Sequence, residues 1–584
     1  MSYNLLLEPW IDVINSDDSI ESVGLIKLFK NAHCIKDFVP VVFHGVSFPL
    51  YNYCALRLCC GILADAYNEA EEEFDANDLL RKQKFDMTSG SILDAYFKKY
   101  EDRFDLFDKT HPFMQANAED LKIWEDHGCT NCEKDNLVML NPCAPADSGR
   151  ITEVKPEEMK KIIQAFGCDS PSPLYGFNVN DVDSKALKSV IADVYAVPAK
   201  EWAYICLYQN CIAPGVGGGN KAAIAGNAYY TEVLQGKDLF RTITMNSVSV
   251  ALSENRTTNK PIWRWESNTS LFFRPKEVSL DHLSGLFCPS KVIAAKKVEN
   301  NIVKSVVQSP LRFGKNDDNI LEDLRQKWAI SFEPHCVVNY QNLPMKKDKK
   351  TKKDVRDFQK NPYRSFPRGS NHLWILTGAT QTKTAKLSET EFIQLAMAAK
   401  NTRRCFEDGK KVIFTDEDVH VRNYYRSCDS HWVYETTGTQ DGILPFALFM
   451  STDKQLFVRK AIEYISNAGF KLDVCVKNYY NYDKSDLRPS ASFSYTMYNY
   501  LGINGEQNGL FRQIADANKK SDLDTLWSKL TKHIVTTAME VFTQYLIPAK
   551  TADYYKQRTD LRKELYGNKG AKLYVTDNKQ ESKS

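Results

Sequence analysis

Apolar residues in the first part of the chain follow two different periods. Short β-rich runs occupy residues 38–43 and 46–48, on either side of His44-Gly45. From residue 51 to residue 67, Ala, Leu and Cys recur at helical spacing. Strands and a helix are therefore predicted to alternate early in the chain. The polar stretch 116–173, rich in Asn, Asp, Gly and Pro, predicts long loops instead.

After about residue 445 the pattern predicts helices only. In the clearest case, apolar residues recur three or four positions apart: Leu526, Leu530, Ile534, Ala538, Val541 and Tyr545. Ser521 is the expected N-cap of this helix, Asp524 lies in its first turn, and Pro548 is the expected stop. The spacing predicts one amphipathic helix of about six turns.

Three further helices are predicted in the same region. One covers 453–468 and ends at Gly469, and another covers 552–566 and ends at Gly567. A third is expected between residues 492 and 517. Four helices with short joins favour an antiparallel bundle.

These patterns predict an α+β protein with two domains. A chain of 584 residues is too long for one hydrophobic core, because single cores stop growing near about 250 to 300 residues. We expect a large mixed α/β N-terminal domain at 1–444, followed by a C-terminal four-helix bundle at 445–584 with a frayed tail.

Composition indicates a soluble globular protein, because 43% of residues are hydrophobic and 26% are charged. No apolar stretch reaches the 18 or so residues that a membrane helix needs. The fifteen Cys are scattered, and no secretion signal precedes them, so reduced thiols in the cytoplasm are expected. The prediction is a cytoplasmic protein with no membrane partner.

Net charge says little about nucleic acid, because 76 Lys and Arg nearly balance 74 Asp and Glu. One local run is strongly basic, however. It contains Lys346, Lys347, Lys349, Lys350, Lys352, Lys353, Arg356, Lys360, Arg364 and Arg368. Such a run is a candidate contact for phosphates, and its alternative is a solvated loop.

A Gly-rich stretch, 213–221, does not fit a nucleotide-binding loop. A phosphate loop requires Gly five residues after the first and Ser or Thr after Lys, but Asn220 and Ala222 stand there. Asn220 also replaces the last Gly of the dinucleotide fingerprint. A backbone turn with close contacts is the better interpretation.

Metal and catalytic motifs are weak. His127, Cys129, Cys132 and Cys143 could supply four zinc ligands, but no second matching Cys pair supports the site, which favours unligated cysteines in a loop. No His-Glu-x-x-His and no Gly-x-Ser-x-Gly is present. We therefore expect no cofactor and no enzymatic activity, although a nuclease that assembles carboxylates from distant segments stays open.

Several segments, taken in order, resemble one known family. They are 4–13, 104–107, His111-Pro112-Phe113-Met114-Gln115, the block from Ala213 through Gly236-Lys237-Asp238-Leu239 to Thr242 and Asn246, Pro261-Ile262-Trp263, 285–289, and Glu333-Pro334-His335. This ordered set resembles CasA, the large subunit of the type I-E CRISPR surveillance complex called Cascade. The helical tail resembles the C-terminal bundle of the same family.

The resemblance implies that the chain contacts duplex DNA beside the target. Family members read the flanking motif from the minor groove with a lysine, a glycine-rich loop and a hairpin that wedges between the strands. Lys327 resembles the lysine, with a solvated helix lysine as its alternative. Val197-Pro198-Ala199-Lys200 stands where the family has adjacent glycines, so Lys200 is a second candidate contact and the preferred flank could differ.

By order and spacing, the wedge falls near residues 421–427. Its candidate residues are Arg422, Asn423, Tyr424, Tyr425 and Arg426. A tyrosine ring could stack on an exposed base, which is worth about 1 to 3 kcal/mol. The alternative is that the two tyrosines alternate across a strand with one ring in the core. A second candidate wedge is Gln381-Thr382-Lys383-Thr384.

The resemblance also implies partners: a CRISPR guide RNA, double-stranded target DNA, the backbone and small subunits of Cascade, and a helicase-nuclease recruited after binding. The expected function is recognition of the flanking motif and strand separation, without hydrolysis. A metal-dependent nuclease subunit and a purely structural scaffold are the alternatives.

Overall fold

The computed structural model describes most of both ends of the chain and shorter segments between them. The described residues are 2–43, 46–117, 197–212, 229–251, 291–310, 345–347, 354–356, 381–382, 385–386, 418–428, 434–448, 451–480, 489–502, 506, 508–546 and 551–567. They form two compact units. The first comprises Met1–Ser365 with Asn423–Thr439, and the second comprises Phe366–Arg422 with Gln440–Ser584.

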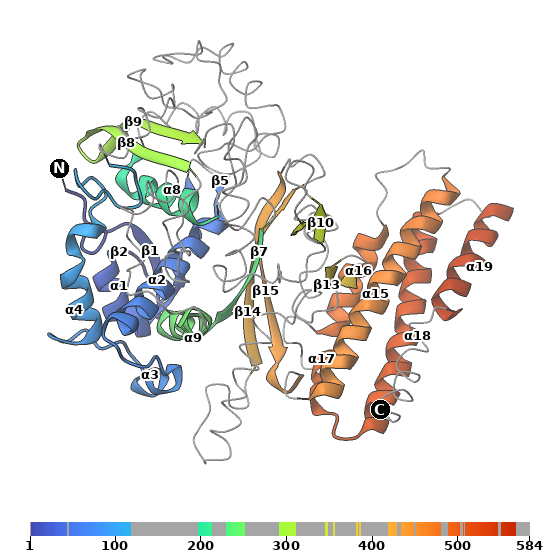
Figure 1. The fold of residues 1–584 in the computed structure, drawn as a ribbon. Coiled ribbons are helices and arrows are strands. Elements are labelled where there is room, and N and C mark those ends of the chain that lie inside the picture. Colours follow the sequence, from blue (N-terminus) through green and yellow to red (C-terminus); the bar gives the residue numbers. More distant parts are fainter. Residues whose placement is uncertain are drawn as a thin grey trace, which may run out of the picture. The chain divides into compact units, whose positions relative to one another are not determined.

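Strands and helices alternate at the start of the first unit, as the sequence predicts. The antiparallel strands β1 (Ile11–Asn15), β2 (Ile20–Val23) and β3 (Ile35–Phe38) form a sheet in the order β2-β1-β3. The short strands β4 (Val42–Phe43) and β5 (Val46–Ser47) pair as a hairpin. The mixed content of helix and strand is confirmed (Figure 1).

The core of the first unit surrounds helix α2 (Pro49–Glu69), which begins with Pro at its first position, where the missing N–H costs nothing. Every residue from Leu50 to Ala66 is buried. The helices α8 (Ala199–Cys211) and α9 (Leu239–Ala251) pack against it. Rings fill the space between, because Tyr51 stacks on Tyr204 at 5.9 Å between centroids, and Tyr204 meets Trp10 edge-on at 5.2 Å. The predicted helix at 51–67 is thus confirmed.

The first two resembling segments, 4–13 and 104–107, lie against each other. The Leu5 amide donates to the Phe104 carbonyl at 2.9 Å, and the Leu106 amide donates to the Tyr3 carbonyl at 2.9 Å. A turn follows in which the Trp10 indole donates to the Leu5 carbonyl at 3.0 Å. Gly24 packs on this turn so closely that a Cβ would lie 2.7 Å from the Leu6 carbonyl oxygen. The motif therefore closes the chain start onto residues about a hundred positions later.

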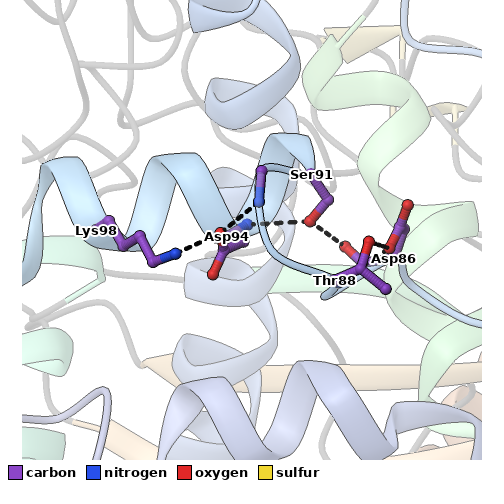
Figure 2. Close-up of polar contacts among 6 residues, drawn as sticks. Asp86, Thr88, Ser91, Asp94 and Lys98 are labelled. Atoms are coloured by element: carbon purple, nitrogen blue, oxygen red, sulfur yellow. Dashed lines mark hydrogen bonds and ion pairs between the residues drawn. The ribbon is translucent and has the colours of Figure 1, made fainter.

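Helix α4 (Ile92–Lys99) shows how local sequence sets an element's start (Figure 2). The Ser91 hydroxyl accepts from the Asp94 amide at 3.4 Å, while the Asp94 carboxylate accepts from the Gly90 amide at 2.7 Å and contacts Lys98 at 2.8 Å. These contacts satisfy amides that a helix start leaves open. Asp86 fixes the preceding turn, because its carboxylate accepts from the Thr88 hydroxyl at 2.6 Å. The helix thereby places Tyr96 beside the buried Asp65 of α2, to which its hydroxyl donates.

The described part of the second unit is mainly helical, and Figure 1 shows its long helices side by side. Its helices are α15 (Thr452–Tyr479), α16 (Pro489–Leu501), α17 (Leu510–Asp516), α18 (Lys520–Tyr545) and α19 (Ala552–Gly567). Helix α15 packs against α16, α18 and α19, and α18 packs against α16 and α19. The short helix α17 contacts α15, α16 and α18. A four-helix bundle as a separate domain at 445–584 stays a prediction.

Two predicted helix ends in this region are wrong. Helix α15 runs through Gly469 to Tyr479, because a glycine can continue a helix as well as end one; a Cβ here would lie 3.4 Å from the Ser490 Cβ of α16, an ordinary contact. Helix α18 begins at Lys520, so Ser521 lies inside its first turn. The N-cap position is held by Lys519 instead of Ser521. The Lys519 amide donates to the Asp522 carboxylate in the first turn at 3.1 Å.

Candidate nucleic-acid interface

The structure describes some of the predicted contact residues and not others. Lys200, Lys346, Lys347 and the segment Arg422–Arg426 lie among the described residues. The other predicted residues lie outside them: Lys327, Lys349, Lys350, Lys352, Lys353, and the candidate zinc ligands His127, Cys129, Cys132 and Cys143. Their assignments stay predictions.

The segment at the position of the family's glycine loop is regular. Val197 and Pro198 form β6, which pairs with β9 (Ile302–Pro310), itself paired with β8 (Lys291–Glu299). Helix α8 starts at once, and the Ala199 amide donates to the Asn301 carbonyl at 2.9 Å. The strand leads directly into the helix with no loop between them, and the correspondence of this segment to the family's glycine loop stays a prediction.

Lys200 lies in the first turn of α8 and its ammonium contacts both carboxylate oxygens of Asp12 on β1. Both side chains remain about a third exposed, at 31% and 34%. The Ser22 hydroxyl of β2 also donates to Asp12. A DNA phosphate that binds Lys200 would have to displace Asp12. This is feasible because an exposed ion pair contributes only about 0 to 1 kcal/mol. Lys200 stays a candidate contact.

The predicted wedge lies on a long β-hairpin formed by β14 (Asp418–Cys428) and β15 (Tyr434–Pro445), with β7 (Tyr229–Gln235) next to β14. The part from Asn423 to Thr439 belongs to the first unit. Within the hairpin, the Arg422 guanidinium of β14 contacts the two carboxylate oxygens of Asp441 of β15 at 2.7 and 3.0 Å. Such a paired contact ties the two strands together.

Tyr424 lies in the core. Its side chain is 2% exposed, and its ring packs against Tyr53 of α2 with the centroids 5.5 Å apart. This burial favours the alternative in which one tyrosine of the pair faces the core. Successive side chains of a strand point to opposite faces, so any stacking on a base falls to other members of the candidate set.

The basic run begins on a second hairpin. Strand β10 (Met345–Lys347) pairs with β11 (Asp354–Arg356), with Lys347 opposite Asp354. Lys347 is exposed. The second candidate wedge also lies on a hairpin, in which β12 (Gln381–Thr382) pairs with β13 (Ala385–Lys386). Contact of the basic run with phosphates and the wedge role of residues 381–384 both stay predictions.

Gln115, the last residue of the motif His111-Pro112-Phe113-Met114-Gln115, joins three segments. Its amide nitrogen donates to the Leu106 carbonyl at 2.7 Å, and its amide oxygen accepts from the Trp202 indole at 3.0 Å and from the Ala295 amide at 2.8 Å. The preceding Met114 has a positive φ of 53°, a backbone conformation that such a side chain rarely adopts. Sequence reasoning missed this joint, because its partners are far apart in the chain.

The described residues contain no group of three or more His, Cys, Asp or Glu side chains placed to hold a metal ion. Within the same residues, no helix has the length and apolar character needed to cross a membrane.

The sequence matches the family described as CRISPR-associated protein Cse1 over residues 4–538, which is most of the chain. The chain belongs to the Cse1 family. This confirms the resemblance to CasA, for which a solved relative carries the double name CasA (Cse1). A comparison with curated proteins gives no match.

Solved Cse1 structures share the fold along nearly the whole chain. Cse1 from Thermobifida fusca has a TM-score of 0.59 at 15% identity, covering 98% of this chain and 99% of that one. CasA from Thermus thermophilus has a TM-score of 0.55 at 14% identity, covering 97% and 100%. A chain from a structure titled "CRISPR RNA-guided surveillance complex, pre-nicking" has a TM-score of 0.50 at 13% identity, covering 97% and 99%.

Proposed function

We propose that this Cse1 protein is the large subunit of a type I-E Cascade complex. In that role it recognises the motif beside the target in duplex DNA and starts strand separation. Membership of the Cse1 family over residues 4–538 is the observation that carries this proposal. The relative from an RNA-guided surveillance complex supports guide RNA and other Cascade subunits as partners.

The mechanism divides recognition between RNA and protein. Guide RNA reads the target by base pairing, while the protein reads only the short flanking motif. In the minor groove, A·T and T·A present the same acceptors, so a protein reading there tolerates several motifs. Lys327 and Lys200 are the proposed contacts, and lysines of the run from Lys346 to Lys353 would follow phosphates.

Strand opening is the step that needs help. Exchange of a DNA duplex for an RNA–DNA hybrid is nearly balanced, but the first step loses about 1.4 kcal/mol of stacking per base-pair step before the guide can pair. A hairpin wedged beside the flank would offset that cost. We propose that the β14–β15 hairpin does this, with Arg422, Asn423, Tyr425 and Arg426 as the candidate contacts to the bases and Tyr424 in the core.

The remaining parts of the proposal concern assembly. The helices of the second unit form the C-terminal bundle that contacts the small subunits, and the assembled complex recruits a separate helicase-nuclease. The chain itself performs no hydrolysis and acts in the cytoplasm.

The proposal is tested by binding of the reconstituted complex, with and without this chain, to duplexes that differ only in the flank. We expect tight, flank-dependent binding only when the chain is present. In the same assay, Lys327→Ala should weaken binding to the correct flank by about tenfold, the loss of one base contact worth about 1 to 3 kcal/mol. Unchanged affinity and flank preference would refute the assignment of Lys327.

A further inference from the structure

Strand β7 is attached to helix α9 by one buried side chain. The Asn246 amide oxygen accepts from the Leu234 backbone amide at 3.0 Å, and its amide nitrogen donates to the Leu234 carbonyl at 2.8 Å. Asn246 is fully buried. Its side chain thus meets both backbone groups of one strand residue, as a neighbouring strand would.

The connection between β7 and α9 is fixed as well. The Gly236 amide donates to the Thr242 hydroxyl at 2.9 Å, and the Asp238 carboxylate accepts from the Arg241 amide at 2.8 Å. A Cβ on Gly236 would lie 2.4 Å from the Arg241 Cβ, so only glycine fits at this turn. The resembling block from Gly236 to Asn246 therefore holds the strand on the helix.

The adjacent strand is attached to the same group of helices. β14 lies between β7 and β15, and its Tyr424 ring packs on Tyr53 of α2. Helix α2 in turn packs against α9. Two strands of the sheet are thus held at separate points, one by hydrogen bonds and one by ring packing.

We propose that Asn246, Thr242 and Tyr424 are positioning residues that hold the β14–β15 hairpin rigid while it separates DNA strands. This rests on the proposed function of the hairpin. A hairpin can separate two DNA strands only if displacing the hairpin from the protein costs more free energy than unstacking the base pairs. Releasing Asn246 would leave two buried backbone groups of Leu234 without partners, so the support resists displacement. A flexible hairpin would bend away from the DNA.

The inference predicts a defect confined to opening. In the reconstituted complex, Asn246→Leu and Tyr424→Leu should slow R-loop formation at least tenfold on a duplex with the preferred flank. On the same duplex with the flank-adjacent pairs mismatched, the rate should stay within about twofold of the unsubstituted complex, because no opening is needed. An equal loss on both targets, or a loss on neither, would overturn the inference.

Asn210→Leu is the matched control for folding. Asn210 is a buried amide of α8 that donates to the Met114 and Cys206 carbonyls at 3.0 and 2.7 Å, and these bonds do not involve the hairpin sheet. It should lower the melting temperature as Asn246→Leu does while leaving the ratio of the two rates unchanged. If Asn246→Leu fails to assemble, Thr242→Val replaces it, since valine keeps the shape and removes only the two hydroxyl bonds of this turn, from the Gly236 amide and to the Asp238 carbonyl. If Asn210→Leu changed the ratio of the rates on the intact and mismatched duplexes as much as Asn246→Leu does, the positioning role would be refuted.

Substitutions in the hairpin itself separate the two claims. If Tyr425→Ala with Arg426→Ala leaves duplex opening unchanged, the hairpin is not the wedge and the proposed function of this element fails. If that pair slows opening but the supporting substitutions do not, the hairpin is the wedge and the positioning inference alone is wrong.

Discussion

The two units of this Cse1 protein bury polar side chains to different extents. In the described part of the second unit, only Ser494 and Thr537 are buried polar residues, whereas the rest of that class, from Asn52 to Ser247, lies in the first unit. Apolar packing is not directional, but a hydrogen bond fixes distance and angle. The first unit thus gains defined joints between distant segments, and we expect the helices of the second unit to tolerate exchange of similar apolar side chains.

The largest expected effect tests the joints of the first unit. Gln115→Leu would leave the Trp202 indole N–H and the Ala295 amide without a hydrogen-bond acceptor. Each unsatisfied donor costs about 1 to 3 kcal/mol of folding free energy. We expect the first unit to lose roughly 3 to 5 kcal/mol, since the Leu106 carbonyl also loses its donor. Hydrogen exchange of α8 and β8 amides measures this.

Gln513→Leu serves as the control, because Gln513 is exposed and bonds only the Asn508 carbonyl at 3.0 Å. This substitution should change the free energy of unfolding, as measured by hydrogen exchange, by less than about 0.5 kcal/mol. If the two substitutions lowered the free energy of unfolding equally, the buried hydrogen bonds of Gln115 would contribute no more to stability than the exposed bond of Gln513.

A cavity tests the second unit. Leu530 is fully buried on α18, so Leu530→Ala should destabilise this unit by about 2 to 5 kcal/mol, while Leu530→Met should cost less than about 1.5 kcal/mol. Urea unfolding followed by helical circular dichroism measures both. If Leu530→Met destabilised the unit as much as Leu530→Ala, the second unit would not tolerate exchange of similar side chains, and the contrast with the first unit would fail.

A small stabilisation should come from α15. Gly469 is inside this helix, and a Cβ would meet the Ser490 Cβ at 3.4 Å, which is ordinary contact. Gly469→Ala should therefore stabilise the second unit by about 0.5 to 1 kcal/mol through helix propensity. Gly509→Ala is the contrasting case, because its Cβ would lie 2.5 Å from the Gly502 Cα. A loss of stability for Gly469→Ala would mean that α15 and α16 cannot separate at all.

The smallest effect concerns pH. His533 of α18 stacks on Tyr500 of α16 at 3.8 Å between centroids, and burial lowers the pKa of the imidazole, with Glu540 acting in the opposite sense. A lowered pKa favours the neutral ring in the folded state. Stability from this group is present above the unfolded pKa of about 6.5 and declines as the pH falls below it. His533→Phe should flatten the decline in melting temperature between pH 7 and 5, whereas an unchanged slope would assign it to other groups.

Sequence alone predicted the parts that depend on periodicity. The helices over 51–67 and 526–545 were recognisable because a buried face repeats every three or four residues. Gly469 was misassigned because a glycine that ends a helix and a glycine in the interior of a helix look the same in sequence.

The candidate site was less accessible to sequence reasoning. The contact of Lys200 with Asp12 joins residues 188 positions apart, a pairing that no local pattern contains. Alternation left open the alternative that one of Tyr424 and Tyr425 faces the core, and it could not say which. Only the contact with Tyr53 identifies Tyr424 as that residue.

The most direct measurement is the rate of R-loop formation by Cascade assembled with and without this chain, on a flanked duplex and on the same duplex mismatched beside the flank. With the chain, both targets should open at similar rates. Without it, the intact duplex should open at least a hundredfold more slowly and the mismatched one should recover most of that loss. Equal opening of the intact duplex with and without the chain would contradict the account.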